Sequence, residues 1–177
     1  MNEGAFPEGS LGPIEIRDAE VADLRAIFDI YNHEVLHSTA TFDTEPRVVG
    51  TDDGWLTGRD HTRHPVLVAE TGGDVVGWAS LGQWSPRPAY GRSAEESVYV
   101  HRARRGQGIG RVLVEAAIER GRTAGLGVLI ARIAEANPAS VRLHESLGFD
   151  HIGTQRRCGE KFGRILDVEL MELHLDA

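Results

Sequence analysis

The segment Arg104-Arg105-Gly106-Gln107-Gly108-Ile109-Gly110 lies between the apolar stretch Ser97-Val98-Tyr99-Val100 and an amphipathic run that begins at Ile109. This order predicts a strand, a glycine-rich turn and the start of a helix. Glycine lets the main chain take left-handed conformations and approach a ligand closely. The amide groups and the positive dipole at a helix N-terminus attract anionic oxygens. We therefore expect these residues to hold the pyrophosphate of a phosphorylated cofactor.

The glycine spacing separates the candidate cofactors. A dinucleotide fingerprint, G-x-G-x-x-G, would need its third glycine at Arg111, and a P-loop would need a lysine followed by serine or threonine. Neither condition is met. The remaining pattern, R-x-x-G-x-G from Arg105 to Gly110, resembles the pyrophosphate signature of the GNAT superfamily of N-acetyltransferases, whose cofactor is acetyl-CoA. A plain glycine-rich strand-to-helix connection with a basic rim is the structural alternative.

The flanking residues favour the binding interpretation. Apolar side chains recur at helical spacing after the glycines, which predicts a helix with one buried face. They are Ile109, Val112, Leu113, Ala116 and Ala117. Positive charge gathers around the same turn, at Arg102, Arg104, Arg105 and Arg111.

Composition limits the partners. The chain has 177 residues, 41% of them hydrophobic, and a net charge of -8, which suits one packed domain and disfavours nucleic acid or an anionic membrane. A local basic patch can still bind a small polyanion. The single Cys158 has no partner for an intramolecular disulfide, and we interpret it as a bystander thiol rather than a nucleophile. Without an apolar leader or a long apolar run, a soluble cytoplasmic protein is expected.

We expect the chain to divide into a flexible leader at residues 1–13, rich in glycine and proline, and one domain at residues 14–177. Asp18 is expected to cap a helix with one apolar face, formed by Val21, Leu24, Ile27, Phe28 and Tyr31. A polar loop at residues 38–45 and a weaker helical segment near 46–58 follow.

Strands dominate the rest of the chain. The apolar runs at 66–69 and 75–79 flank the turn at 71–74 and predict a hairpin. Beyond the helix at Ile109, residues 128–131 predict a buried strand, and a helix is punctuated by an N-cap at Asn137, a proline at 138 and Gly148 at its end. Two final strands are expected near 152–156 and 166–175.

This order of elements matches the GNAT fold, an α/β (α+β) fold with a mixed central sheet whose central strands are splayed and flanked by helices. The resemblance extends from Ile14 onward. Further motifs are similar to those of the phosphinothricin and methionine sulfoximine N-acetyltransferases. They are Thr39-Ala40-Thr41-Phe42-Asp43-Thr44-Glu45-Pro46, Glu95-Glu96-Ser97-Val98-Tyr99-Val100, Asn137-Pro138-Ala139-Ser140, Leu143-His144-Glu145-Ser146-Leu147-Gly148-Phe149 and Gly159-Glu160-Lys161-Phe162-Gly163.

Acetyl transfer to an amine needs a base, donors that hold the thioester and a proton for the departing thiolate. The resemblance places the catalytic carboxylate at Glu95, immediately before the central strand, and a catalytic histidine at His144. Alternatively, Glu95 is an exposed residue at the edge of a strand, and His144 is a partly buried helix residue whose hydrogen bonds are made within the fold. Whether His144 acts as an acid or a base stays open.

The resemblance also implies the cofactor-binding set. Main-chain amides near Val98 and Val100 would hold the thioester and pantetheine, which Asn137 and Ser146 would touch. Alternatively, Asn137 only caps the helix that follows it, and Ser146 is an exposed surface residue. The full set is Val98, Tyr99, Val100, Arg105, Gly106, Gln107, Gly108, Ile109, Gly110, Arg111, Asn137 and Ser146.

For the acceptor, the resemblance places Arg87, Tyr90 and Phe42 in the binding site, because an arginine can grip a carboxylate or phosphinate with two hydrogen bonds. It implies direct transfer, in a ternary complex, from acetyl-CoA to the α-amino group of phosphinothricin, methionine sulfoximine or methionine sulfone. A homodimer, a part in herbicide resistance and no metal are also implied. Ser85 and Ile165 depart from the usual family pattern.

Two other functions compete with this interpretation. His33-Glu34-Val35-Leu36-His37 fits H-E-x-x-H, in which two histidines bind zinc and the glutamate activates water. A zinc hydrolase therefore stays an alternative, although no convincing third ligand helix follows. A non-catalytic CoA-binding sensor would keep the glycine loop and tolerate loss of Glu95.

Overall fold

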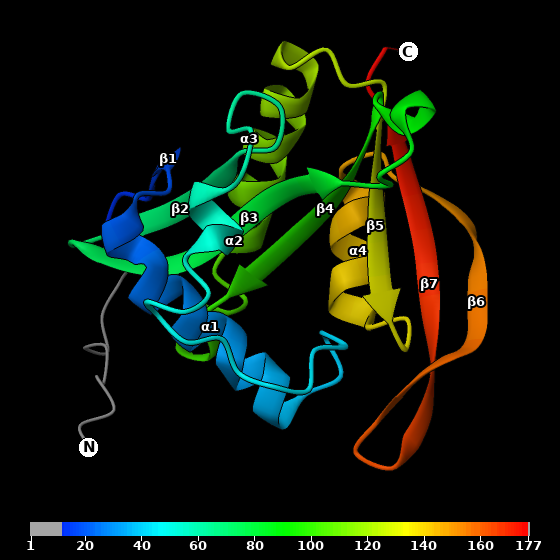
Figure 1. Cartoon of the computed structure of the whole chain (residues 1–177), viewed down its shortest axis with the longest axis horizontal. Coiled ribbons are helices and arrows are strands. Elements are labelled where there is room, and N and C mark those ends of the chain that lie inside the picture. The colour runs from blue at the N-terminus through cyan, green and yellow to red at the C-terminus, as the bar shows by residue number, and fades with distance from the viewer. Residues whose placement is uncertain (1–11, 177) are drawn as a thin grey trace.

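The computed structural model describes residues 12–176, so most of the predicted leader at 1–13 lies outside the described residues. The strands form a seven-stranded sheet in the order β1-β2-β3-β4-β5-β7-β6 (Figure 1). Neighbouring strands are antiparallel, except that β4 and β5 are parallel. Their bounds are β1 Glu15–Asp18, β2 Val66–Thr71, β3 Asp74–Gln83, β4 Ser93–Val100, β5 Val128–Ala134, β6 Asp150–Lys161 and β7 Arg164–His174. The predicted mixed sheet is confirmed.

Helices cover both faces of this sheet (Figure 1). The α-helices are α1 Leu24–His37, the single turn α2 Gly54–Thr57, α3 Ile109–Thr123 and α4 Pro138–Ser146. Short 3-10 turns lie at Val21–Asp23, Pro88–Tyr90 and Arg102–Arg104. Among the described residues, no helix is both long enough and apolar enough to cross a bilayer.

Two apolar clusters form the core, one on each face of the sheet. Along β2, Leu67 and Ala69 pack with the buried face of α3, whereas Val66 and Val68 pack with α1. Alternate side chains of a strand point to opposite faces, which explains how one short apolar run serves both clusters. The helix predicted after the glycine loop is confirmed and lies against β3 and β4.

The central strands part halfway along their length. Strands β4 and β5 are paired from Ser93 opposite Val128 to Glu96 opposite Ala131, and β5 continues to Ala134 without β4. The predicted splay is therefore confirmed. Strand β4 begins at Ser93, so the prediction that Glu95 precedes the strand is wrong, and Glu95 is a strand residue.

The predicted cap at Asp18 is also wrong. Asp18 ends β1, and the chain then enters a 3-10 turn in which the Glu20 amide donates to Asp23 Oδ2 at 2.8 Å. Arg17 holds the same carboxylate at 2.7 Å. The cap thus depends on a residue inside the turn, and Val21 of the predicted apolar face is 58% exposed.

The weak helix predicted near 46–58 shrinks to α2. Side chains compete for the main-chain donors ahead of it, because Val48 N donates to Asp52 Oδ2 at 2.6 Å and Gly50 N donates to Asp53 Oδ1 at 2.7 Å. Such local bonds favour turns over helix.

We expect Gly77→Ala to lower the free energy of unfolding by about 1–3 kcal/mol, as overpacking does. A Cβ at Gly77 would lie 3.0 Å from Leu113 Cδ1 and 3.0 Å from the carbonyl oxygen of Tyr99, where α3 packs on the sheet. Urea denaturation measures the change. Gly54→Ala, where a Cβ would meet nothing within 4 Å, is the control and should not destabilise the fold. Equal stability of both variants would contradict this packing.

Candidate active site

The parting of β4 and β5 opens two cavities that meet between the strands. One, of about 460 Å³, reaches from the glycine loop to α4, and the other, of about 450 Å³, lies between α1, α2 and the sheet. Five residues line both cavities: Ala40, Ser97, Tyr99, Arg132 and Ala134. Two ligands, one in each cavity, would therefore touch at this junction.

The first cavity has the features that a pyrophosphate needs. Gly106 and Gly108 have φ angles of 75° and 83°, in the left-handed region, and a Cβ on either would meet nothing within 4 Å. Gly108 is the N-cap of α3, so the free amides of the first helical turn follow directly. Gly110 lies against Leu143, because a Cβ there would approach Leu143 Cδ2 to 3.4 Å. The loop thus fits a phosphorylated cofactor.

Main-chain groups of β4 face the same cavity. The His101 amide donates to the carbonyl of Val76 at 2.9 Å, toward β3. In an antiparallel pair, the residues that bond to the neighbouring strand alternate. Val98 and Val100 therefore turn their amides and carbonyls the other way, toward the gap beside β5. The Val100 carbonyl accepts from Arg105 Nε at 3.3 Å, and the remaining groups face the gap, where an extended arm of the cofactor fits.

Most of the predicted cofactor-binding residues line this cavity; Gln107 and Ser146 do not. The Gln107 side chain bonds to the carbonyl of Ala103, and Ser146 Oγ bonds to the carbonyl of Leu143 at 2.7 Å. Asn137 lines the cavity and also caps α4, since its side chain accepts from the amides of Ala139 and Ser140. The individual roles stay predictions.

Arg105 is tied to a buried carboxylate, Glu34, which the sequence analysis considered only as part of the zinc alternative. Its Nη2 donates to Glu34 Oε1 at 2.5 Å, and its Nε donates to the carbonyl of Val100 at 3.3 Å. Glu34 is 4% exposed and also accepts from Ser38 Oγ at 2.7 Å. This pair places the Arg105 guanidinium at the end of β4, beside the glycine loop.

The same contacts argue against the zinc alternative. His33 and His37 lie on one side of α1 with ring centroids 4.9 Å apart, whereas the Glu34 carboxylate turns inward to Arg105 and Ser38. Within the described residues, no group of three potential ligands could hold a metal ion. A glutamate fixed in this way cannot activate a water on the histidines, so the zinc hydrolase is not supported.

His144 lies at the wall of the first cavity, buried to 2% exposure. Its Nδ1 is 2.8 Å from the carbonyl of Ser140, which requires a proton on that nitrogen, and its Nε2 is 3.0 Å from Glu96 Oε2. Burial opposes a charge here, but the hydrogen bond and the charge of Glu96 raise the pKa of His144. Glu96 Oε1 is buried and has no hydrogen-bond partner among the described residues.

Glu95 faces the second cavity, as alternation along β4 requires. Both of its carboxylate oxygens accept from Arg132, at 2.8 Å to Nε and 2.7 Å to Nη2. Arg132 was missed from the sequence, although one arginine inside the otherwise apolar strand Val128–Ala134 was a usable signal. The pair stands beside Ser97, where the two cavities meet.

Aromatic rings line part of the second cavity. Trp78 stacks on Tyr99 with centroids 4.7 Å apart, and Tyr31 meets Tyr99 edge-on at 5.2 Å. Of the predicted acceptor residues, Phe42 lines this cavity. Arg87 and Tyr90 lie outside its lining, on the exposed β3–β4 connection, and their role stays a prediction.

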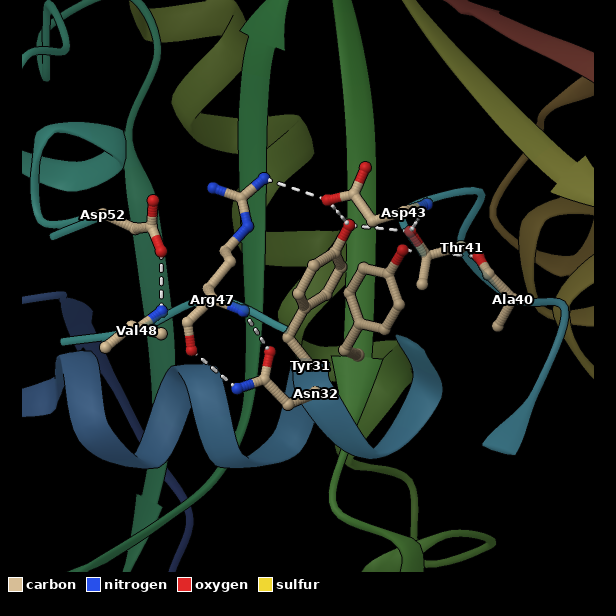
Figure 2. A network of polar contacts seen from close by, with 9 residues as sticks. Tyr31, Asn32, Ala40, Thr41, Asp43, Arg47, Val48 and Asp52 are labelled. Carbon is tan, nitrogen blue, oxygen red and sulfur yellow. Dashed lines mark hydrogen bonds and ion pairs between the residues drawn. The ribbon is translucent and has the colours of Figure 1, made fainter. Parts of the chain in front are cut away.

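A polar network joins α1 to the loop that follows it, beside this cavity (Figure 2). The Tyr31 hydroxyl donates to Asp43 Oδ2 at 2.8 Å, and Arg47 Nη2 approaches the same oxygen at 3.3 Å. Asn32 of α1 pins Arg47, because its amide exchanges two 2.8 Å bonds with the Arg47 main chain. The loop after α1 is therefore tied to the helix by side-chain hydrogen bonds.

A cradle for a phosphorylated cofactor, an adjoining cavity for a small molecule and a carboxylate beside their junction define a group-transfer enzyme. Residues 24–149 match the model of the acetyltransferase (GNAT) family. The chain belongs to this family, and it is an acetyltransferase that uses acetyl-CoA.

Individual relatives are similar over nearly the whole chain. The L-methionine sulfoximine/L-methionine sulfone acetyltransferase of Salmonella typhimurium is 44% identical over 163 residues, 91% of this chain and 94% of the relative. The phosphinothricin N-acetyltransferase of Streptomyces viridochromogenes is 40% identical over 158 residues, 88% of this chain and 85% of the relative. The structure of yncA from S. typhimurium with its cofactor acetyl-CoA has a TM-score of 0.88 at 42% identity, covering 92% of this chain and 94% of that one.

We expect Gly108→Val to weaken acetyl-CoA binding by about tenfold or more, because a branched side chain at φ 83° strains the loop and occupies the space that the pyrophosphate needs. Titration calorimetry measures the affinity. Gly125→Val is the matched control: Gly125 also has a positive φ, 68°, and open space, but lies beyond the end of α3. Unchanged affinity in a folded Gly108→Val protein would remove the loop from the cofactor site.

The His144–Glu96 pair makes stability depend on pH. Because the pKa of His144 is raised in the folded state, its contribution is complete below the ordinary value of 6.5 and is lost as the pH rises through the folded-state value. We expect the free energy of unfolding of the wild type to fall more steeply above about pH 6.5 than that of Glu96→Gln. Urea denaturation over a pH series checks this, and parallel curves would contradict it.

Proposed function

We propose that the protein transfers the acetyl group of acetyl-CoA to the α-amino group of a small amino-acid analogue, such as methionine sulfoximine, methionine sulfone or phosphinothricin. The observation that carries the proposal is the junction at Ser97 and Arg132, where the cofactor cavity opens onto a separate small-molecule cavity beside Glu95. The names of the relatives support this class of acceptor.

In this proposal Glu95 is the base. Acetyl-CoA supplies the acetyl group as a thioester. The bidentate pair with Arg132 fixes the Glu95 carboxylate toward the acceptor cavity, where it takes one proton from the ammonium group. The free amine then attacks the thioester carbon, the new C–N bond forms and the C–S bond breaks. The second amine proton goes to the sulfur, so that CoA leaves as a thiol.

The main chain of β4 and the helix ends supply the remaining functions. Val98 and Val100, facing the gap, hold the cofactor arm, and the glycine loop with Arg105 holds the pyrophosphate. His144 and Glu96 share a proton on the cofactor side of the strand, within the wall that would surround the departing sulfur. We propose His144 as the second catalytic group on this basis.

We also propose that the protein is a cytoplasmic homodimer. Large apolar side chains are exposed on the β6–β7 hairpin, where a second copy would cover them: Ile152 by 48%, Phe162 by 57% and Ile165 by 50%. Light scattering on the eluting protein measures the oligomeric state, and a monomer mass at micromolar concentration would contradict the dimer.

We expect Glu95→Gln to lower turnover by about 10² to 10⁴, a typical general-base factor, while acetyl-CoA affinity is preserved. Raising the pH should restore part of the rate, because more of the acceptor is then free amine. Thiol release with methionine sulfone as acceptor measures both effects. Glu119→Gln, an exposed change on α3, is the control. A wild-type rate for Glu95→Gln at neutral pH would show that another group is the base.

A further inference from the structure

Two arginines converge on one indole ring inside the acceptor cavity. The guanidinium carbon of Arg59 lies 5.0 Å from the centroid of Trp55, and that of Arg47 lies 5.4 Å from it. Both arginines line the cavity. Stacked guanidinium groups are held in place while their N–H groups stay available, so this arrangement presents donors to whatever fills the cavity.

The charges that line this cavity do not balance. Its charged lining residues are the arginines Arg47, Arg59 and Arg132 and the carboxylates Asp43 and Glu95. Asp43 is paired with Arg47, and Glu95 with Arg132. The excess positive charge therefore belongs to Arg59, in a chain whose net charge is -8. This cavity is cationic in an acidic protein.

Within the described residues, Arg59 bonds to main-chain carbonyls and to no carboxylate. Its Nε donates to the carbonyl of Trp55 at 3.1 Å, and its Nη1 donates to that of Leu81 at 3.3 Å. Burial, followed by the charge of Arg47, lowers the pKa of Arg59 below its ordinary value. A partly buried cation without a counterion is costly, and an anionic ligand group would remove that cost.

Arg59 also lies next to Gly82, which is paired with the proposed base, Glu95, on the neighbouring strand. Gly82 of β3 is paired with Glu95 of β4. A Cβ built on Gly82 would lie 3.8 Å from Arg59 Nη2 and 3.8 Å from the carbonyl oxygen of Glu95. The uncompensated guanidinium and the proposed base thus flank one part of the cavity floor. An α-amino acid carries its carboxylate and its amine on the same carbon. A guanidinium and a base that lie side by side therefore suit these two groups.

We propose that Arg59 binds the α-carboxylate of the acceptor and thereby presents the neighbouring amine to Glu95. This inference rests on the proposed function and narrows it: the acceptors are free α-amino acids and their analogues, and amines without an adjacent carboxylate are poor substrates. Arg59 is then a specificity-determining residue that α2 and its following turn carry to the cavity.

The test compares L-methionine sulfone with its carboxamide, using the wild type and Arg59→Gln. We expect the wild type to favour the acid, and the substitution to lower kcat/KM for the acid by about 10- to 100-fold, as loss of a charged hydrogen bond does. The kcat/KM for the amide should change by less than about threefold. The different amine basicities of the two acceptors cancel in this comparison, because both enzymes are measured with both acceptors.

Each outcome is decisive. Because both acceptors are measured on the same preparation, partial misfolding of Arg59→Gln would lower both rates together and leave their ratio intact. Arg25→Gln, an exposed change on α1, removes the same charge elsewhere and should leave the ratio at its wild-type value. An equal loss for acid and amide, or a wild type that does not distinguish them, would overturn the assignment of Arg59. A wild type that acetylates neither would instead overturn the proposed function.

Discussion

The limited pairing of β4 with β5 is the constraint on which the site depends. Their ladder ends at Glu96 and Ala131, and beyond it the main-chain groups of Val98 and Val100 have no strand beside them. Unpaired main-chain groups inside a protein are costly unless a ligand or water satisfies them. The gap is sustained because β3 pairs with β4 from Ala94 to Val100 and β7 pairs with β5 from Val128 to Ala134. Each half of the sheet is thus stable without the missing contacts.

Three acid–base pairs surround this gap, and each joins elements that are distant in sequence. Glu34 of α1 holds Arg105, Glu95 holds Arg132 of β5, and Glu96 holds His144 of α4. Glu95 and Glu96 are consecutive residues, yet they serve different cavities because successive side chains of a strand point to opposite faces. Arg59 differs from the other cations of the acceptor cavity in having no such partner. The charge that the fold leaves uncompensated therefore lies where the acceptor is proposed to bind.

Local features were the ones that could be predicted. The glycine loop, the α3 face and the capped α4 each depend on residues within a few positions of one another, and all three were confirmed. The predictions for Asp18 and for the segment 46–58 were wrong because other side chains form the hydrogen bonds. Asp23 provides the cap, and Asp52 and Asp53 accept from amides that a helix would use. Helix propensity, which describes single residues, does not include such competing hydrogen bonds.

The sequence by itself determined the order of elements, the glycine cradle and the family, because glycine conformation, helix capping and apolar periodicity are short-range properties. Only the tertiary structure decided which charges meet. It turned Glu34 away from the two histidines of its motif and toward Arg105, 71 positions along the chain. It also brought Arg59 from the turn after α2 to Gly82 and Glu95. Which residues become such partners depends on how the strands and helices pack against one another. The spacing of residues within one segment does not specify it.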